Sequence, residues 1–252
     1  MVPELEKATV QMKDAEHVKE ILSRLRKGGA DQLQVISDFD MTLTRFGFNG
    51  QRCPTSYNII DNSRVISEEG KKKLKDMLHY YYPIEIDPYR TVEDKLPHMI
   101  EWWTKAHSLL SQQKILKSDI AQIVKESDVM LRDGVNLFFD QLYQSRVPLF
   151  IFSAGVGDVL EEIIRQAGVF HPNVHVVSNY MDFDEHPWRN ETTYFRASHA
   201  LRCGMSFHRV GFLNDRVEEQ REKYIEAYDV VLEKDETLDV ANGILRFILA
   251  ET

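Results

Sequence analysis

Two aspartates one residue apart, Asp38 and Asp40, form the pattern that most specifically predicts chemistry in this chain. They follow a short apolar segment, in which we expect a strand that buries Val35 and Ile36. Residues i and i+2 of an extended chain point the same way, so both carboxylates should face one site while Phe39 turns into the core. The spacing therefore predicts a paired carboxylate site at the end of a strand.

Such a pair could bind a metal ion and act on phosphorus. Adjacent carboxylates repel each other unless a cation lies between them, and oxygen ligands at this spacing suit Mg²⁺. One carboxylate can attack phosphorus covalently while the other gives and takes a proton. We interpret Asp38 and Asp40 as catalytic residues and Mg²⁺ ligands; the plainer alternative is an acidic turn after a buried strand.

A hydroxyl follows a second apolar segment, residues 147–152, which predicts another buried strand. Ser153 comes next, before Ala154 and Gly155. A hydroxyl and free backbone N–H groups at such a turn can hold phosphate oxygens. Taken alone, the segment is more simply a strand-to-helix turn that uses Ser and Gly for geometry. Together with the aspartate pair, it indicates a phosphate site.

These side chains require a framework of alternating strands and helices. The apolar spacing predicts strands over residues 33–38, 147–152, 174–177 and 230–232. It predicts helices over residues 4–26, 68–79, 92–111, 117–132, 159–167 and 238–249, with Asp158 as a helix N-cap. This alternation indicates an α/β fold with a doubly wound, mostly parallel, Rossmann-like sheet, whose ligands bind at the carboxyl ends of strands.

Composition limits the class of protein. The 252 residues are 43% hydrophobic and 28% charged, as in an ordinary globular protein. The net charge of −9 argues against nucleic-acid partners. The two cysteines allow no disulfide framework and favour a reducing compartment. With no apolar signal or membrane-spanning segment, we expect a cytoplasmic monomer without a membrane partner.

The segments around both candidate sites resemble the cytosolic 5′-nucleotidase III family of the haloacid-dehalogenase-like superfamily. The resemblance covers residues 30–185 and 210–250 and includes the segments Asp38–Arg45, Tyr82–Pro88, Glu101–Lys105, Phe150–Gly155, Val177–Phe183 and Gly211–Asp215. Trp102-Trp103 with Ala106 is more similar to the 7-methylguanosine phosphate-specific branch than to the pyrimidine-specific branch.

The resemblance implies a role for each candidate residue. Asp38 would form an aspartyl-phosphate, and Asp40 would protonate the leaving 5′-oxygen and then activate water. Both aspartates would hold Mg²⁺, Asp40 through its backbone carbonyl, and Ser153 and Ala154 would bind the phosphate. The products would be a nucleoside and phosphate, from nucleoside 5′-monophosphates such as 7-methylguanosine 5′-monophosphate and CMP.

The resemblance also divides the chain into a core, residues 1–44 and 134–252, and an inserted helical cap, residues 45–133. Glu85 of the cap would contact the base. N7-methylguanine is cationic, so an indole face and a carboxylate suit it, which makes Trp103 the second candidate for base recognition. We expect Trp102 to be core packing.

Residues 186–209 depart from the family pattern. They contain no Lys, no Asp, no strand-like apolar run and no Gly-Asp pair. The family should have here a Lys that holds nucleophile and phosphate together, and a Gly-Asp-Ser-x-Gly-Asp motif whose Asp completes the Mg²⁺ site. We therefore expect one core strand to be missing and activity to be weak or lost. The alternatives are a non-catalytic nucleotide-binding chain and a generic small-molecule phosphatase.

Overall fold

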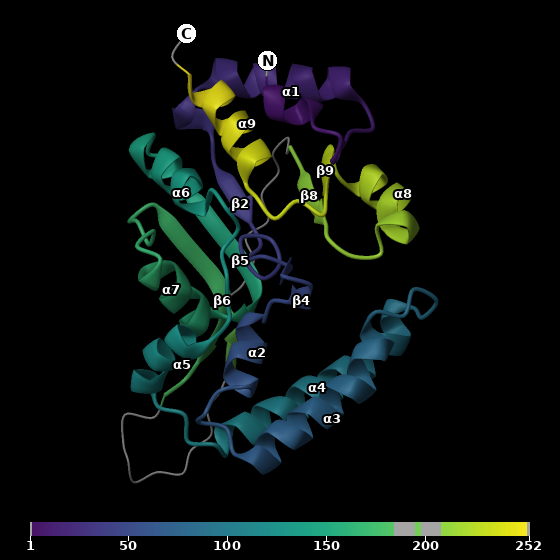
Figure 1. The fold of residues 1–252 in the computed structure, drawn as a ribbon, viewed down its shortest axis with the longest axis vertical. Helices are drawn as coiled ribbons and strands as arrows, with labels where there is room; N and C mark the ends of the chain where they lie inside the picture. Colours follow the sequence, from purple (N-terminus) through teal and green to yellow (C-terminus); the bar gives the residue numbers. More distant parts are fainter. Residues whose placement is uncertain (1, 184–194, 198–207, 251–252) are drawn as a thin grey trace.

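The computed structural model describes residues 2–183, 195–197 and 208–250 (Figure 1). Among these residues the larger sheet has the strand order β2-β5-β6-β7. β2, β5 and β6 are parallel, whereas β7 is antiparallel to β6. Their bounds are Val35–Ser37 for β2, Leu149–Val156 for β5, Val174–Met181 for β6 and Phe195–Ala197 for β7.

A smaller sheet with the order β1-β9-β8 lies on the side of β2 (Figure 1). β8 and β9 are parallel, and β1 is antiparallel to β9. The bounds are Val10–Gln11 for β1, Val210–Leu213 for β8 and Val230–Glu233 for β9. Helices connect and cover the parallel strands, which confirms the predicted α/β, mostly parallel core.

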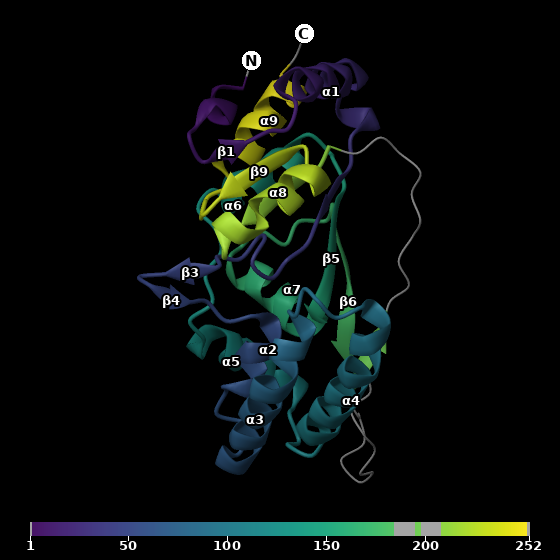
Figure 2. The same cartoon turned by 90° about the vertical axis from the view of Figure 1, so that its right-hand side faces the viewer.

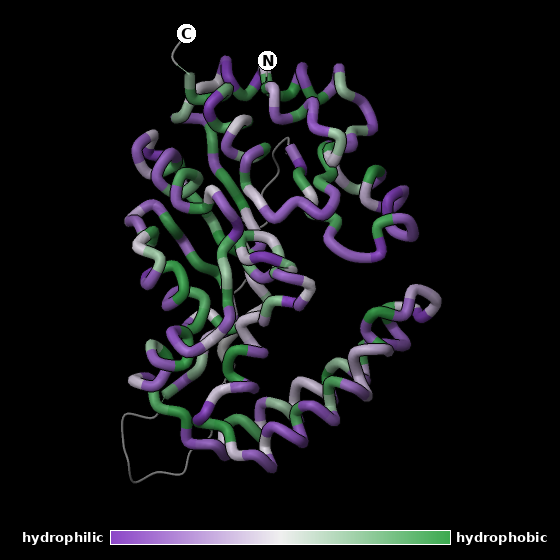
Figure 3. Tube along the Cα trace, viewed as in Figure 1, coloured by the Kyte–Doolittle hydropathy of each residue, from purple (hydrophilic) through white to green (hydrophobic). Residues whose placement is uncertain are grey.

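The main core lies around β5 and the helices that cover the larger sheet. Leu149 and Ile151 of β5 are completely buried, as are Val159, Leu160 and Ile164 on the apolar face of α7. Figure 3 shows hydrophobic stretches along these strands and helices. The covering helices are α5 (Ile120–Glu126), α6 (Val135–Gln144) and α7 (Gly157–Gln166).

A second core lies between the smaller sheet, α1 (Ala15–Gly28) and α9 (Asp239–Leu249). The Asp14 carboxylate caps α1 by accepting the N–H of His17 at 2.9 Å, and Gly29 ends it with a φ of 71°. α8 (Val217–Ala227) connects β8 to β9. Both ends of the described chain lie at this end of the molecule (Figures 1 and 2).

A helical hairpin projects from the other end of the molecule, as both views show. It consists of α3 and α4, whose N-caps are Ser67 and Thr91. The segment between β2 and α3 contains the small hairpin β3-β4 and the short helix α2. The bounds are Gly47–Phe48 for β3, Gln51–Arg52 for β4, Ser56–Asp61 for α2, Glu68–Glu85 for α3 and Val92–Ser111 for α4.

Several predicted boundaries were wrong because long-range contacts outweigh local pattern. The predicted helix 4–26 contains the strand β1, since Val10 pairs with Leu232 of β9. The predicted helix 117–132 is a 3₁₀ turn, Lys117–Asp119, followed by α5, which ends at Glu126. Asp158 lies in the first turn of α7 rather than at its N-cap, because its carboxylate accepts the N–H of Met181 at 2.8 Å.

Ile36 is not buried, contrary to the prediction for the first strand. Its side chain is 46% exposed, although β2 pairs with β5 along its length. Burial on this side depends on a neighbour at the other edge of β2, and the described residues supply none. The predicted loss of a core strand within residues 186–209 falls mostly outside the described residues, which include only β7 and residues 208 and 209 of that segment.

Candidate active site

Asp38 and Asp40 leave the carboxyl end of β2 as the period of an extended chain predicts. Phe39 between them is fully buried, so the two carboxylates lie on the other side of the backbone. The charge of Asp38 reaches the Asp40 carboxyl closely enough to raise its pKa. The structure therefore brings this predicted pair together.

Water is partly excluded from both carboxylates. This loss of solvation is the main cause that raises the pKa of Asp38 and of Asp40 above the ordinary value. Hydrogen bonds oppose the shift: the Thr42 hydroxyl donates to Asp38 at 3.3 Å, and the Ser56 hydroxyl and N–H donate to Asp40 at 2.7 and 2.9 Å. These partners are uncharged, so they compensate only part of the cost of placing two acids side by side.

Ser56, the first residue of α2, was missed by the sequence analysis. Thr55 caps this helix in a capping box with Asn58, which fixes the direction of its first turn. The Ser56 hydroxyl donates to Asp40 and accepts the N–H of Val156 at 3.1 Å. One buried hydroxyl therefore connects the end of β5 to the second aspartate. The pattern Thr55-x-x-Asn58 was the signal that could have revealed this helix start.

Ser153 and Ala154 lie within β5 rather than in a turn after it, because the strand continues to Val156 across a register irregularity. Gly155 shows how close this segment lies to the aspartates. A Cβ at Gly155 would clash with the Ser56 hydroxyl and would lie 2.7 Å from Asp40 Oδ2 and 3.1 Å from Ser153 Oγ. Ser153, the predicted phosphate-binding residue, and Asp40, the predicted acid, therefore both lie next to Gly155.

The metal prediction depends on this pair of carboxylates. Asp38 and Asp40 are desolvated oxygen donors, and Mg²⁺ is often held by one or two carboxylates together with substrate phosphate oxygens. The donor set therefore fits Mg²⁺. Within the described ranges, no group of three or more His, Cys, Asp or Glu residues forms a further metal cluster.

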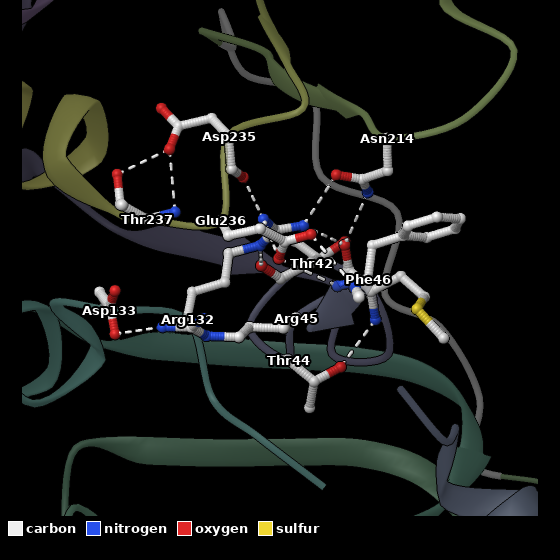
Figure 4. A network of polar contacts seen from close by, with 12 residues as sticks. Thr42, Thr44, Arg45, Phe46, Arg132, Asp133, Asn214, Asp235, Glu236 and Thr237 are labelled. Carbon is white, nitrogen blue, oxygen red and sulfur yellow. Dashed lines mark hydrogen bonds and ion pairs between the residues drawn. The ribbon is translucent and has the colours of Figure 1, made fainter. Parts of the chain in front are cut away.

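A buried arginine, Arg132, holds the loop that follows the aspartates (Figure 4). Its side chain is inaccessible to solvent, and its guanidinium donates to the carbonyl oxygens of Met41 and Thr42, each at 2.8 Å. Met41 has a φ of 62°, which is unusual for a residue with a side chain. The buried cation thus stabilises a strained turn next to the candidate catalytic pair.

The same arginine contacts the smaller sheet. It donates to the Asn214 side chain, which follows β8, at 3.1 Å, and to the Glu236 carboxylate at 3.1 Å. Its guanidinium also lies 4.0 Å from the ring centroid of Phe212 in β8. Figure 4 shows Arg132, Asn214 and Glu236 converging from separate segments. The sequence analysis missed Arg132, since no local pattern marks a buried cation.

The two candidate base-recognition residues lie on the helical hairpin. Trp103 in the middle of α4 packs on Tyr57 of α2, with ring centroids 4.9 Å apart. Glu85 is the last residue of α3, and Lys95 donates to its carbonyl oxygen at 2.8 Å. Trp102 stacks on Tyr81 at 5.7 Å and packs against the main core. The structure thus places Trp103 next to the helix that contacts Asp40, and Glu85 further along the hairpin.

Comparison with known proteins identifies the family. A family model described as pyrimidine 5′-nucleotidase (UMPH-1) matches residues 41–191 and 197–249. The chain belongs to this family. It is 59% identical to the 7-methylguanosine phosphate-specific 5′-nucleotidase of Gallus gallus over 289 aligned positions, which cover all of both chains. It is 55% identical to the Homo sapiens protein of the same name, covering 99% of this chain and 96% of that one.

A solved structure supports the same assignment. Cytosolic 5′-nucleotidase IIIB bound to cytidine has a TM-score of 0.85 and 29% sequence identity, covering 98% of this chain and 96% of that chain. The predicted family and fold are therefore confirmed, and the nucleotidase belongs among the phosphoric monoester hydrolases.

The comparisons also bear on the unusual segment before β8. The nucleotidase has 252 residues, whereas its alignment with the Gallus gallus relative spans 289 positions, so that relative has residues without a counterpart here. The family match is interrupted between residues 191 and 197.

Proposed function

We propose that this nucleotidase hydrolyses nucleoside 5′-monophosphates, in particular 7-methylguanosine 5′-monophosphate and CMP, to nucleoside and phosphate. The convergence of Asp38, Asp40 and Ser153 at the carboxyl ends of β2 and β5 carries this proposal. The names of the relatives support the first substrate, and the cytidine in the solved neighbour supports the second.

The chain's own residues suggest the order of steps. An Asp38 oxygen attacks phosphorus and the bond from phosphorus to the 5′-oxygen breaks, while Asp40 gives its proton to that oxygen. Asp40 then takes a proton from water, which attacks phosphorus and releases phosphate from Asp38. The raised pKa of Asp40 favours the protonated form that the first step requires. Ser56 orients the Asp40 carboxylate through two hydrogen bonds.

Mg²⁺ is the proposed cofactor, held by Asp38 and Asp40. When bound, it neutralises the charge that the two carboxylates and the phosphate bring together. Ser153 and Ala154 would bind the phosphate oxygens. Residues 45–133 would form the cap over the core of residues 1–44 and 134–252, with Trp103 and Glu85 selecting the base.

We propose that the activity of this chain is weak. Residues 186–209 contain no Lys that could hold the nucleophile and the phosphate together, and losing one such electrostatic group commonly costs on the order of 10²–10³ in rate. They also contain no Asp that could complete the Mg²⁺ site, which should lower the affinity for Mg²⁺. We further propose a monomer that resides in the cytoplasm. Among the described residues, no helix is long and apolar enough to cross a membrane.

The test is phosphate release from 7-methylguanosine 5′-monophosphate, CMP and GMP, with and without Mg²⁺. We expect slow, Mg²⁺-dependent release that prefers the first two substrates and disappears in Asp38→Asn. The matched control is Asp76→Asn, which removes an exposed carboxylate of α3. Binding without release would favour the non-catalytic alternative, and equal rates on all monophosphates would favour a generic phosphatase. Full-rate release would contradict the proposed impairment.

A further inference from the structure

Two side chains of β6 hold the backbone at the end of β5, where we propose that phosphate binds. The Asn179 side chain donates to the carbonyl oxygen of Ala154 at 2.8 Å, and the Ser178 hydroxyl donates to the carbonyl oxygen of Gly155 at 2.9 Å. The register between β5 and β6 shifts at this point. A regular ladder would pair such carbonyl oxygens with backbone N–H groups, so the two side chains replace ladder bonds where the ladder is interrupted.

These two bonds set the direction of two peptide groups. In a trans peptide, the C=O and the N–H point to opposite sides. Because the Ala154 carbonyl is turned toward β6, the N–H of Gly155 points away from β6 and donates to Ser153 Oγ at 3.0 Å. The Gly155 carbonyl is also turned toward β6, and the N–H of Val156 donates to Ser56 Oγ at 3.1 Å. Each bond from β6 therefore directs one N–H group toward one hydroxyl of the candidate site.

Both hydroxyls can then donate their hydrogens to acidic groups. A serine hydroxyl has one hydrogen to donate and two lone pairs that accept. Ser56 Oγ accepts the N–H of Val156 and donates its hydrogen to Asp40 at 2.7 Å. Ser153 Oγ likewise accepts an N–H, so its hydrogen can be donated to a phosphate oxygen. The side chains of β6 thus act on both hydroxyls through the backbone of β5.

Gly155 explains why this backbone needs support. A glycine has no Cβ, so its backbone rotates more freely than that of other residues. A Cβ at this position would clash with the Ser56 hydroxyl, so a stiffer residue does not fit. A peptide group that turned over here would bring a carbonyl oxygen to the side of Asp40 and the phosphate. That oxygen would repel a phosphate, whereas an N–H group attracts it.

The end of β6 is itself attached to α7. The N–H of Met181 donates to the Asp158 carboxylate at 2.8 Å, and the Tyr180 hydroxyl donates to the Glu161 carboxylate at 2.6 Å. The Tyr180 ring also lies so close to Gly157 that a Cβ there would be 2.7 Å from the ring atoms. The two side chains that hold the end of β5 therefore project from a part of β6 that is fixed in place.

We propose that Ser178 and Asn179 are positioning residues for the phosphate that the nucleotidase binds. This inference rests on the proposed function and adds two residues that act through others. Asn179 acts on Ser153 through one peptide group of β5. Ser178 acts on Ser56 through the next peptide group. Loss of either side chain should weaken phosphate binding, because the peptide group that it holds can then turn its carbonyl oxygen toward the phosphate.

The first measurement is the affinity of the full chain for inorganic phosphate with Mg²⁺, by titration calorimetry. Asn179 also has a side-chain hydrogen bond with Tyr57, so a probe without a base isolates the phosphate side. Asn179→Ala and Ser178→Ala should each weaken binding about tenfold, as expected for one hydrogen bond to a charged group. Ser178→Thr keeps the hydroxyl and should restore the affinity. The matched control is Asn173→Ala, because the Asn173 side chain donates to the Val147 carbonyl at 2.8 Å, near the opposite end of β5.

The second measurement, amide hydrogen exchange followed by NMR, needs neither ligand nor turnover. The Gly155 N–H should exchange faster in Asn179→Ala than in the natural chain. The Val156 N–H should exchange faster in Ser178→Ala. Both should be unchanged in Asn173→Ala. Melting curves show the temperature range in which every variant is folded, and a merely structural role would lower the melting temperature without changing the phosphate affinity.

Weaker phosphate binding and faster exchange in the two alanine variants, with neither change in Asn173→Ala and restored affinity in Ser178→Thr, support the proposal. Unchanged phosphate affinity in both alanine variants, unchanged exchange of both N–H groups, or a natural chain that does not bind phosphate overturns it. If the natural chain still released phosphate from CMP, the proposed function would survive that result. Weaker phosphate binding in the variants of a natural chain that releases no phosphate from any monophosphate would leave this proposal standing and count against the proposed function.

Discussion

The ionised form of Asp38 destabilises the folded chain. Its pKa is raised, chiefly by loss of solvation, so folding favours the protonated acid and this stabilisation is lost as the pH rises through the range between the unfolded and folded pKa values. We expect Asp38→Asn to raise the melting temperature at neutral pH by a few degrees, and less in acid. Mg²⁺ should stabilise the natural chain and not the variant. Thermal melts of the natural chain and of Asp38→Asn, with Asp76→Asn as a control, measure these effects. Equal stabilisation of the natural chain and of Asp38→Asn by Mg²⁺ would contradict the prediction.

Asp61, at the end of α2, should produce a separate pH dependence. Burial raises its pKa to about 7, and its Oδ1 atom has no hydrogen-bond partner among the described residues. Folding therefore takes up a proton between about pH 4 and pH 7, and the stability supplied by that proton is lost as the pH rises through this window. We expect the unfolding free energy of Asp61→Asn to fall less steeply with rising pH than that of the natural chain. The measurement is urea unfolding of both chains from about pH 4 to pH 7. If the unfolding free energies of the two chains fell in parallel as the pH rises, the prediction would be wrong.

Within β5, the short segment that ends the strand has no space for a side chain at Gly155. A methyl group there would meet the Ser56 hydroxyl and Asp40 Oδ2. We expect Gly155→Ala to cost about 1–3 kcal/mol in unfolding free energy by overpacking. It should also weaken Mg²⁺ binding, since the Asp40 carboxylate must move.

Denaturant unfolding and titration calorimetry with Mg²⁺ measure these two effects. Gly28→Ala is the matched control, because a Cβ at Gly28 meets only the Gln32 side chain at an ordinary 3.4 Å. Unchanged Mg²⁺ affinity in a folded Gly155→Ala chain would show that this strand end does not position Asp40.

For the molecule as a whole, Arg132 joins the two sheets. Its solvent-inaccessible side chain contacts the loop after β2 and the residues after β8 and β9, where its ion-pair partner Glu236 is 28% exposed. Removing one partner of a buried ion pair typically costs about 3–5 kcal/mol. We expect Arg132→Met to lower the unfolding free energy by this order and to speed hydrogen exchange in β8 and β9 more than in β5 and β6.

Arg165→Met is the comparison for that experiment. Arg165 lies on α7, and its side chain is 55% exposed and pairs with Glu162. Exposed pairs of this kind contribute little to stability. If both variants lost stability equally, or if exchange rose uniformly, Arg132 would not be the connection between the sheets.

Sequence pattern predicted what depends on neighbours along the chain. The period of two placed Asp38 and Asp40 together and buried Phe39, and the apolar run of β5 placed Ser153 near them. What it could not predict depends on residues far apart in sequence. Ile36 is exposed where no described strand pairs with the second edge of β2. The role of Arg132 depends on a loop about 90 residues away in the sequence.

Ser56 and Tyr57, two consecutive residues of α2, contact the two different parts of the candidate site. Ser56 hydrogen-bonds Asp40, and Tyr57 packs on Trp103 of the projecting hairpin. The first turn of this helix joins them, so displacement of the Trp103 indole by an ill-fitting base would be transmitted to Asp40, the proposed proton donor. Poorly matched nucleotides should therefore turn over more slowly even at saturating concentration, and selectivity would be expressed in kcat as well as in affinity.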